Sequence, residues 1–268
     1  MAGGLLALRL SAAAGTDCHM HVKQNGDFPQ DADRVRSALE GAGLKRACIF
    51  AGGYYAPEGC QGADCPSQRS WTEKANDWTL DQAKTGKDLL PFCGVPLREA
   101  WAPEEVRRCA AKGARGLKVH PVSEDASLRD PKIFAALGAV SKAAARARLP
   151  ILIHIAFEDE EITAFYKLAA ERPRATFILA HQLGPKLARL AEAPANVLVD
   201  ISGLPLAPRA AAPGFVALWR KVGMKRILLG SDWPLLHPSE YTAALRAFPL
   251  TEEERRMIVE DNARRLFP

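Results

Sequence analysis

The stretch TDCHMHV, residues 16–22, has the pattern of a short buried strand that carries two histidines near its end. Because alternate residues of a strand share a face, His19 and His21 are expected to point together into the interior, with Cys18 and Met20 packing outward under helices. Two imidazoles buried this close together are costly unless a partner satisfies both, and a metal ion satisfies both. The stretch therefore predicts a strand that presents a pair of metal ligands.

After this stretch, short apolar runs rich in β-branched residues recur along the chain. The eight strand candidates are residues 16–22, 45–51, 89–96, 115–121, 150–156, 175–181, 196–201 and 226–232. Amphipathic stretches lie between them, and alternation of strand and helix is typical of a parallel sheet. Eight units predict an α/β fold with one closed (β/α)8 TIM barrel over residues 16–268, after an N-terminal extension at residues 1–15. An open doubly wound sheet is the alternative, but we would expect it to carry a glycine-rich first turn, which is missing.

Residues that can bind metal recur where these strands should end. Besides the first pair, the candidates are His120, His154, His181 and Asp232. In a closed barrel the carboxyl ends of all strands open on one face, where such barrels keep their chemistry. Imidazole and carboxylate are natural ligands of divalent ions. Asp232 is interpreted as a ligand or a general base, with a helix N-cap as the alternative, and the chain is predicted to be a metal-dependent enzyme.

Size and charge limit the classes of function. The chain has 268 residues and a net charge of +5, and single barrels of this kind have about 250 residues. No dense block of Lys and Arg stands out, so nucleic acid is not expected as a partner, whereas a small anionic substrate is compatible. No apolar run of about 18 residues occurs, so no membrane span is expected. We expect a cytoplasmic protein, with export and homo-oligomer formation left open.

The six cysteines are expected to be unpaired. Four fall in strand- or helix-like stretches, where a free cysteine packs as a small hydrophobe: Cys18, Cys48, Cys93 and Cys109. The other two, Cys60 and Cys65, share a loop over residues 51–70 that is too long for a plain connector and is expected to be a lid or substrate loop. Reduced thiols are the expectation for this pair, and a disulfide or a metal site stays open.

Six motifs are specific when they are taken together. They are DCHMH (17–21), GLKVHP (116–121), LIHIA (152–156), ILAHQLG (178–184), ILLGSDWP (227–234) and DNARRLF (261–267). Their content and order resemble the amidohydrolase superfamily, in the group often called amidohydrolase 2, and they span nearly the whole chain. The resemblance implies a metal-dependent TIM-barrel enzyme and says little about its substrate.

The resemblance implies a role for each metal-site candidate. His19, His21 and His154 match metal ligands of the family. His181 matches a histidine that binds a second metal ion or polarises the substrate, and Asp232 matches an aspartate that binds metal and takes the proton of the attacking water. A divalent ion can lower the pKa of its bound water to about 7, and a carboxylate beside it can accept that proton. Zinc (Zn2+) is the expected ion, with one ion favoured and two left open.

Lys118 has two interpretations. In family members with two metal ions a lysine on the fourth strand is carboxylated and bridges the ions, and Lys-Val-His-Pro at 118–121 resembles that context. The alternative is a lysine that pairs with a carboxylate or holds a substrate anion. The alternative is the one favoured, in line with one metal ion.

Further residues are candidates for substrate contact because they follow strands or lie in the long loop: His120, Arg98, Tyr54, Arg69 and Trp233. Hydrolysis of an amide, lactone or ester by metal-activated water is the leading interpretation. The alternative is a mononuclear-metal decarboxylase of an unsaturated or aromatic carboxylic acid, in which Arg98 or Arg69 would hold the leaving carboxylate. A third class, a member without metal or activity, is disfavoured by the complete ligand set.

Overall fold

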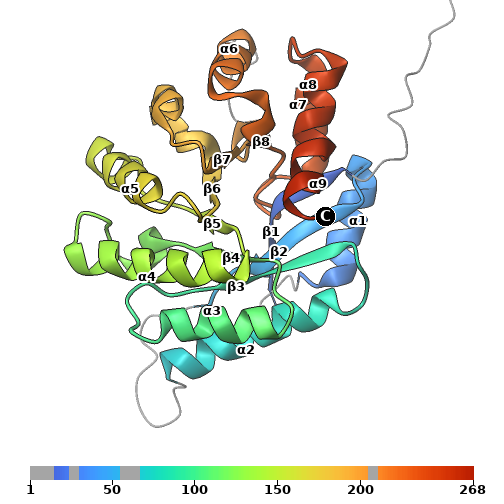
Figure 1. The fold of residues 1–268 in the computed structure, drawn as a ribbon. Helices are drawn as coiled ribbons and strands as arrows, with labels where there is room; N and C mark the ends of the chain where they lie inside the picture. The colour runs from blue at the N-terminus through green and yellow to red at the C-terminus, as the bar shows by residue number, and fades with distance from the viewer. Residues whose placement is uncertain (1–14, 24–29, 55–66, 205–210) are drawn as a thin grey trace, which may run out of the picture.

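A ring of parallel strands enclosed by helices makes up the chain in a computed structural model (Figure 1). The structure describes residues 15–23, 30–54, 67–204 and 211–268, without the side chains of 183–185. The strands pair in the order β1 to β8. They are β1 Thr16–Val22, β2 Arg46–Ala51, β3 Leu89–Gly94, β4 Gly116–Val119, β5 Ile151–Ile153, β6 Phe177–Leu179, β7 Val197–Asp200 and β8 Ile227–Leu228. The predicted (β/α)8 barrel is confirmed.

The sheet returns on itself where the chain after β8 meets β1. The N–H of His21 donates to the carbonyl of Trp233 at 2.8 Å, and the N–H of Asp232 donates to the carbonyl of His19 at 2.8 Å. These bonds place the predicted metal ligands from the two ends of the chain side by side.

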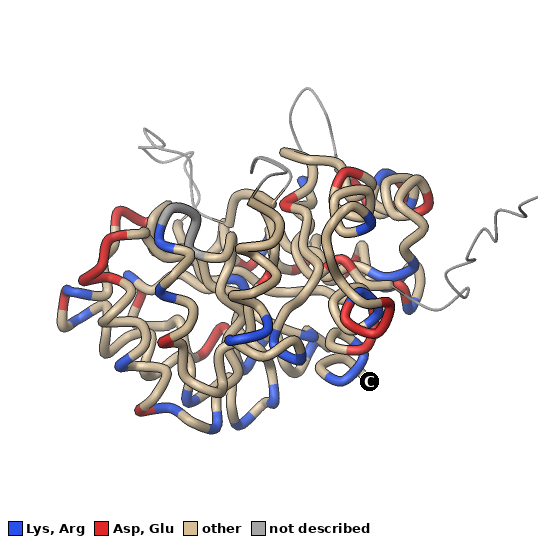
Figure 2. Tube along the Cα trace, turned by 90° about the horizontal axis from the view of Figure 1, so that it is seen from above, with Lys and Arg blue, Asp and Glu red and all other residues tan. Residues whose placement is uncertain are grey.

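Helices lie around the outside of the ring (Figure 1). They are α1 Ala32–Ala42, α2 Gln68–Ala83, α3 Ala102–Ala111, η1 Pro121–Glu124, α4 Pro131–Ala147, α5 Asp159–Glu171, η2 Ala180–Glu192, α6 Ala212–Val222, η5 Met224–Arg226, α7 Pro238–Ala247, α8 Glu252–Arg256, η6 Met257–Asp261 and α9 Asn262–Leu266. Basic and acidic residues are interspersed along them in the described part of the chain (Figure 2), with pairs such as Arg108–Asp77 at 2.6 Å. Among the described residues, no helix combines the length and the apolar character needed to cross a bilayer.

Alternate residues of the strands face two environments. Inside the ring, one buried apolar cluster contains Phe50, Phe92, Leu152, Ile178 and Leu228. The opposite strand faces pack against the helices in a second, larger cluster. Phe267 joins the interior cluster with its ring centroid 5.8 Å from that of Phe92, and its carbonyl accepts from Arg46 at the start of β2 at 3.0 Å. The interior is thus a packed core, and the space for chemistry lies above it at the carboxyl ends of the strands.

Cys18 faces the interior cluster, so the expectation that it packs outward under the helices is wrong. Between Asp17 and Met20, β1 advances three residues while its partner β2 advances two. The extra residue of this bulge interrupts the simple alternation of the strand. Cys18 and His19 therefore both turn inward, whereas Met20 packs in the outer cluster as expected.

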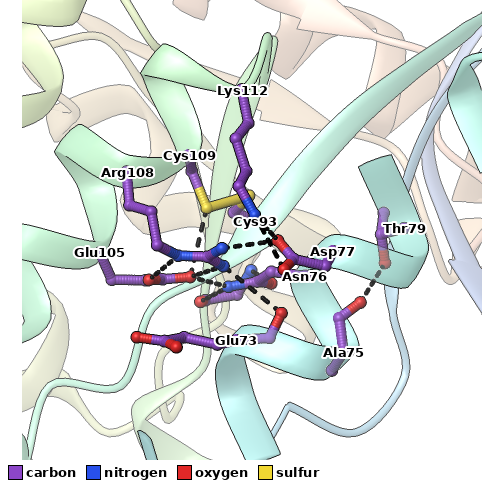
Figure 3. The surroundings of a disulfide bond; sticks show 11 residues. Glu73, Ala75, Asn76, Asp77, Thr79, Cys93, Glu105, Arg108, Cys109 and Lys112 are labelled. Carbon is purple, nitrogen blue, oxygen red and sulfur yellow. Dashed lines mark hydrogen bonds and ion pairs between the residues drawn. A yellow bond between two sulfur atoms is a disulfide. The ribbon is translucent and has the colours of Figure 1, made fainter. Parts of the chain in front are cut away.

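Cys93 and Cys109 form a disulfide, which corrects the expectation that both are free (Figure 3). Cys93 lies on the outward face of β3 and Cys109 on the buried face of α3, so the two side chains meet where the helix covers the strand. No pairing motif marks them in the sequence, since they are simply 16 residues apart. The other described cysteines, Cys18 and Cys48, are free and buried as expected. The pair Cys60 and Cys65 lies outside the described residues.

Hydrophobic periodicity does not predict helix α2. Its buried face is largely polar and includes Thr72, Asn76 and Thr79. The Asn76 amide accepts from the N–H of Gly94 at 2.7 Å and donates to the Gly94 carbonyl at 2.9 Å. Because hydrogen bonds fasten much of this helix to β3, no apolar stripe marks it in the sequence.

The last strands are shorter than expected, since β5, β6 and β8 have 3, 3 and 2 residues. His120, His154, His181 and Asp232 consequently lie just after the strands, at the mouth of the barrel. The expected N-terminal extension falls almost wholly outside the described residues.

Candidate metal centre

His19, His21 and Asp232 lie together at the mouth of the barrel. The Nε2 atoms of His21 and His19 are 2.9 Å and 3.1 Å from Oδ1 of Asp232. β1 supplies the histidines, and the loop after β8 brings the carboxylate back to them. Each residue offers one ligand atom, and these atoms lie within 4.8 Å of one another. The structure thus brings together three of the predicted metal ligands.

The protonation states of this group suit a cation. Burial lowers the pKa of His21 to about 4, so its ring is neutral at pH 7. Burial alone would raise the pKa of Asp232, but hydrogen bonds from His19 and His21 hold it far below its usual range. Burial opposes the charged ring of His19 too, yet Asp200 and Asp232 raise its pKa overall, and a bound metal ion displaces such a proton. Imidazole and ionised carboxylate are the forms that divalent ions bind, so these residues fit such an ion.

Sequence reasoning missed Asp200, which ends β7. The residue is fully buried, and its Oδ2 lies 2.7 Å from Nδ1 of His19. Burial alone would raise its pKa, but His19 above all keeps that pKa below the usual range. Among the described residues, Asp200, His19 and His181 form a second group of ligand-type atoms within 4.8 Å of one another. A signal was available, because NVLVDI (196–201) carries a carboxylate at its end just as RILLGSD (226–232) does.

Lys118 of β4 is buried beside the first cluster. Its Nζ lies 3.2 Å from Nε2 of His19 and 4.6 Å above the ring centre of Phe50. Burial lowers its pKa to about 8, against the opposing charges of Asp232 and Asp200. The lysine is therefore next to the candidate ligands, and its role as a bridging or a pairing group stays a prediction.

His120, His154 and His181 form a second set of imidazoles at the mouth. Nδ1 of His154 lies 2.9 Å from Nε2 of His181, and the ring centroids of His120 and His154 are 4.2 Å apart. Burial lowers their pKa values to about 3 for His120, about 2 for His154 and about 4 for His181. All three rings are thus neutral at pH 7. Within the described residues His154 belongs to neither group of ligand atoms, and its role as a ligand stays a prediction.

The backbone takes the left-handed conformation at His181 and Asp232, with φ of 59° and 62°. This conformation is uncommon for residues other than glycine and persists where the surroundings hold it. The N–H of His181 donates to Oδ1 of Asp200 at 3.1 Å, and that of Asp232 donates to the carbonyl of His19 at 2.8 Å. The turns end the strands early and leave both side chains at the mouth.

A pocket of about 480 Å³ opens beside Asp232 and His181. On its wall, Phe157 lies nearly parallel to His154, with 5.8 Å between ring centroids. Further apolar side chains of the wall are Leu187, Leu204, Phe215, Leu235 and Leu236. A mostly apolar pocket with a few convergent polar groups suits a small, flat, apolar molecule that carries one charged end.

The two arginines predicted to contact substrate have partners within the protein. The guanidinium of Arg98 donates to the carbonyl of Glu124 at 2.6 Å. Arg69, on α2, pairs with Glu73 at 2.9 Å and lies over the ring of Trp101, the residue before α3. In the described part of the chain neither arginine lines the pocket beside Asp232, and their contact with substrate stays a prediction.

The two predicted aromatic contacts also lie outside the wall of that pocket, as far as the structure describes it. The Tyr54 ring is buried against Gly94 of β3, where a Cβ would otherwise stand. Trp233 is half-buried, and its N–H donates to Oγ of Ser231 at 3.1 Å. Their proposed roles, like that of His120, stay predictions.

Comparison with known proteins is consistent with this site. A family model described as amidohydrolase matches residues 16–268. No curated protein matches the chain significantly. Among solved structures, 2,6-dihydroxybenzoate decarboxylase from Rhizobium is similar with a TM-score of 0.73 and 18% identity, over 95% of this chain and 98% of that chain.

Two further similar structures contain manganese and a small aromatic ligand. One is 5-carboxyvanillate decarboxylase from Novosphingobium aromaticivorans with 4-hydroxy-3-methoxy-5-nitrobenzoic acid (TM-score 0.72, 14% identity, 95% of this chain and 96% of that chain). The other is a dihydroxybenzoic acid decarboxylase from a Polaromonas species with 2-nitroresorcinol (TM-score 0.71, 16% identity, 95% and 97%). At these identities the likeness shows a shared fold. The family match covers the whole barrel, and the chain is an enzyme that belongs to the amidohydrolase family.

Proposed function

We propose that this enzyme is a metal-dependent decarboxylase that removes the carboxylate of a small aromatic acid. The observation that carries the proposal is the apolar pocket of about 480 Å³ that reaches Asp232 and His181, next to the candidate metal ligands. An aromatic ring suits the wall of phenylalanine and leucine side chains, and its carboxylate then suits the ionic end. The names of the three compared structures, all decarboxylases of small aromatic acids, support the same substrate class.

Hydrolysis of an amide, lactone or ester was the leading interpretation of the sequence, and the comparisons favour its alternative. One observation keeps hydrolysis as the second candidate. Asp232 lines the pocket, and hydrogen bonds from His19 and His21 hold its pKa far below the usual range, so it is ionised at pH 7. An ionised carboxylate can accept the proton of an attacking water, as hydrolysis of an ester or lactone requires.

In this proposal His19, His21 and Asp232 hold one divalent ion, with His154 as a further predicted ligand. The ion, when bound, supplies positive charge that binds the anionic end of the substrate and stabilises negative charge that develops there. Zinc is the ion expected from the ligand types, whereas two of the compared decarboxylases contain manganese. Histidine and carboxylate ligands accept either ion, so we propose manganese or zinc.

Decarboxylation replaces a C–C bond by a C–H bond. The electron pair of the broken bond stays on the ring carbon, CO2 leaves, and the carbon takes up one proton. Among the described residues, the titratable groups on the pocket wall are Asp232, His154, His181 and Tyr241. We assign relay of the proton to Asp232, whose ionised carboxylate takes one proton from water and passes it to the ring carbon. His181 is left to orient the substrate by hydrogen bonding.

A paired substrate panel tests this function. Manganese-loaded and zinc-loaded protein is offered hydroxybenzoic acids and, as the matched hydrolytic arm, their methyl esters and aryl lactones. We expect CO2 release from at least one acid, with an equal amount of the phenol. In D2O the phenol should carry one deuterium at the vacated carbon. Ester or lactone cleavage without CO2 from any acid would contradict the proposal and favour the second candidate.

A further inference from the structure

Asp200 accepts hydrogen bonds from three residues at the centre of the site. Its Oδ2 lies 2.7 Å from Nδ1 of His19. Its Oδ1 accepts from the backbone N–H groups of His181 at 3.1 Å and Ser202 at 3.0 Å, and from the hydroxyl of Ser202. The carboxylate is fully buried, so these donors replace the water that it would otherwise bind.

This arrangement determines which nitrogen of His19 carries the proton. An ionised carboxylate only accepts hydrogen bonds, so Nδ1 of His19 must donate to Asp200. The neutral ring then has a lone pair on Nε2. Nε2 is the atom that lies 3.1 Å from Oδ1 of Asp232, on the side of the candidate metal ligands.

Ser202 determines in the same way which nitrogen of His181 carries the proton. A serine hydroxyl has a single hydrogen, and that of Ser202 is directed to Asp200. Toward Nδ1 of His181, 2.8 Å away, the hydroxyl oxygen therefore acts as an acceptor. The His181 proton then lies on Nδ1 and its lone pair on Nε2, which accepts from Nδ1 of His154 at 2.9 Å.

We infer that Asp200 and Ser202 are positioning residues that hold His19 and His181 with their protons on Nδ1. The pair thereby presents Nε2 of His19 to the metal ion and keeps Nε2 of His181 as an acceptor, which here takes the hydrogen bond of His154. Neither residue touches the reacting atoms in this assignment. The inference rests on the proposed metal-dependent function for its purpose, but the position of the two protons can be measured without turnover.

The substitution Asp200→Asn reverses the first assignment. Oδ1 must still accept from three donors, so the amide oxygen stays there and the NH2 group faces His19. That group donates, which moves the His19 proton to Nε2 and blocks the metal-binding atom. Loss of such a partner of a ligating histidine typically costs about 10- to 100-fold in metal affinity. We expect this loss in calorimetric titration with manganese, and loss of the His19 Nδ1–H signal in 15N spectra of the histidine-labelled whole chain, with and without zinc.

Two variants serve as controls. Ser202→Ala should change only the His181 signal and lower kcat, with manganese affinity within about twofold of the wild type, because its hydroxyl does not touch His19. Asp17→Asn replaces another fully buried carboxylate, which lies on β1. Its Oδ1 accepts from the backbone N–H groups of His19 and Ser231, each at 3.0 Å, and the carboxylate also interacts with the side chain of Ser231. Because none of these donors is a histidine ring nitrogen, the histidine protons and the metal affinity should stay unchanged.

The outcomes separate this inference from the alternatives. An unchanged His19 signal and unchanged affinity in folded Asp200→Asn would overturn it. Loss of a whole second metal equivalent would also overturn it, because Asp200 would then be a ligand in the group with His19 and His181. If Asp200→Asn does not fold, the His181 signal of Ser202→Ala decides, and an unchanged signal rejects the assignment. Failure to release CO2 would count against the proposed function alone.

Discussion

At the scale of single residues, Asp232 has two proposed roles, as a metal ligand and as the group that transfers the proton. It contacts His19 and His21 and also lines the pocket. Asp232→Asn keeps the shape of the side chain but removes its charge and its ability to carry a proton. We predict a fall in kcat of about 10²- to 10⁴-fold with an unchanged circular dichroism spectrum. The exposed control Asp33→Asn on α1 should keep full activity. A folded Asp232→Asn enzyme with near-normal kcat would show that another residue delivers the proton.

Lys118 distinguishes one metal ion from two. Lys118→Met keeps most of the buried volume but removes the group that a carbamate bridge requires. Since we favour one ion held by His19, His21 and Asp232, we predict about one metal equivalent in both the wild type and the variant, measured by plasma emission spectroscopy. Two equivalents in the wild type that fall to one or none in the variant, with a carbamate visible at Lys118, would establish the bridging role instead.

The strand-end argument found His19, His21 and Asp232 because alternation along strands and closure of the barrel are regular. The same argument applies to Asp200, the carboxylate that ends β7. It could not determine the partners of Arg98 or Arg69, because a long flexible arginine side chain near the surface can reach several. The disulfide of Cys93 with Cys109 depends on how α3 sits on β3, which residue patterns alone do not determine.

At the scale of elements, Asn76 fastens α2 to its neighbours. Its amide bonds both backbone groups of Gly94 and Oε1 of Glu105, at 2.7–2.9 Å (Figure 3). Asn76→Ala leaves buried polar groups without partners, each worth about 1–3 kcal/mol. We predict a loss of about 3 kcal/mol in the free energy of unfolding, measured with urea. The exposed control Asp81→Ala on the same helix should change it by about 0.5 kcal/mol or less, and equal effects of the two would contradict this role.

Glu254 joins α6 to the start of α8 and gives this junction a pH dependence. It accepts from Arg220 at 2.6 Å and 2.9 Å and from the N–H of Thr251 at 2.8 Å. Arg220 above all lowers the Glu254 pKa from 4.5 to about 2. A lowered pKa in the folded state means that the stabilisation is present above pH 4.5 and is lost as the pH falls toward 2.

Glu254→Gln should therefore remove this part of the acid sensitivity. We predict that the variant is less stable than the wild type at pH 7, by about 1 kcal/mol or less, and that the difference shrinks between pH 4.5 and 2. Urea unfolding at a series of pH values measures it, with the neighbouring Glu253→Gln as the control. A difference that stays constant down to pH 2 would show that the charge of Glu254 is irrelevant to stability.

Strands were predicted better than helices. Each of the eight expected strands exists, but the expected ranges of six strands, β3 to β8, extend beyond the observed carboxyl ends because apolar residues continue into the turns at the mouth. Residues 180–192 form the tight η2 helix directly after β6. Hydrophobic periodicity does not predict helix α2, because the buried face of this helix is polar. Hydrophobic periodicity predicts elements that are held by apolar contact. Hydrogen bonds hold α2 instead, and left-handed residues follow β6 at His181 and β8 at Asp232.

At the scale of the whole molecule, closure of the barrel assembles the site. It places residue 232 beside residues 19 and 21, and the sequence predicts this neighbourhood because eight repeated units leave few other ways to pack. The wall of the pocket could not be foreseen in the same way. Phe157, Leu187, Phe215 and Leu235 come from four separate loops and helices, and their convergence on one pocket follows only from the three-dimensional arrangement.

The central claim is that one divalent ion sits between the two ends of the chain at the mouth of the barrel. Anomalous diffraction from a crystal grown with manganese locates that ion directly. The account predicts one strong peak within coordination distance of Nε2 of His19, Nε2 of His21 and the carboxylate of Asp232, and its absence from an Asp232→Asn crystal. A peak that lies instead between His120 and His154, or no peak at saturating manganese, would contradict the account.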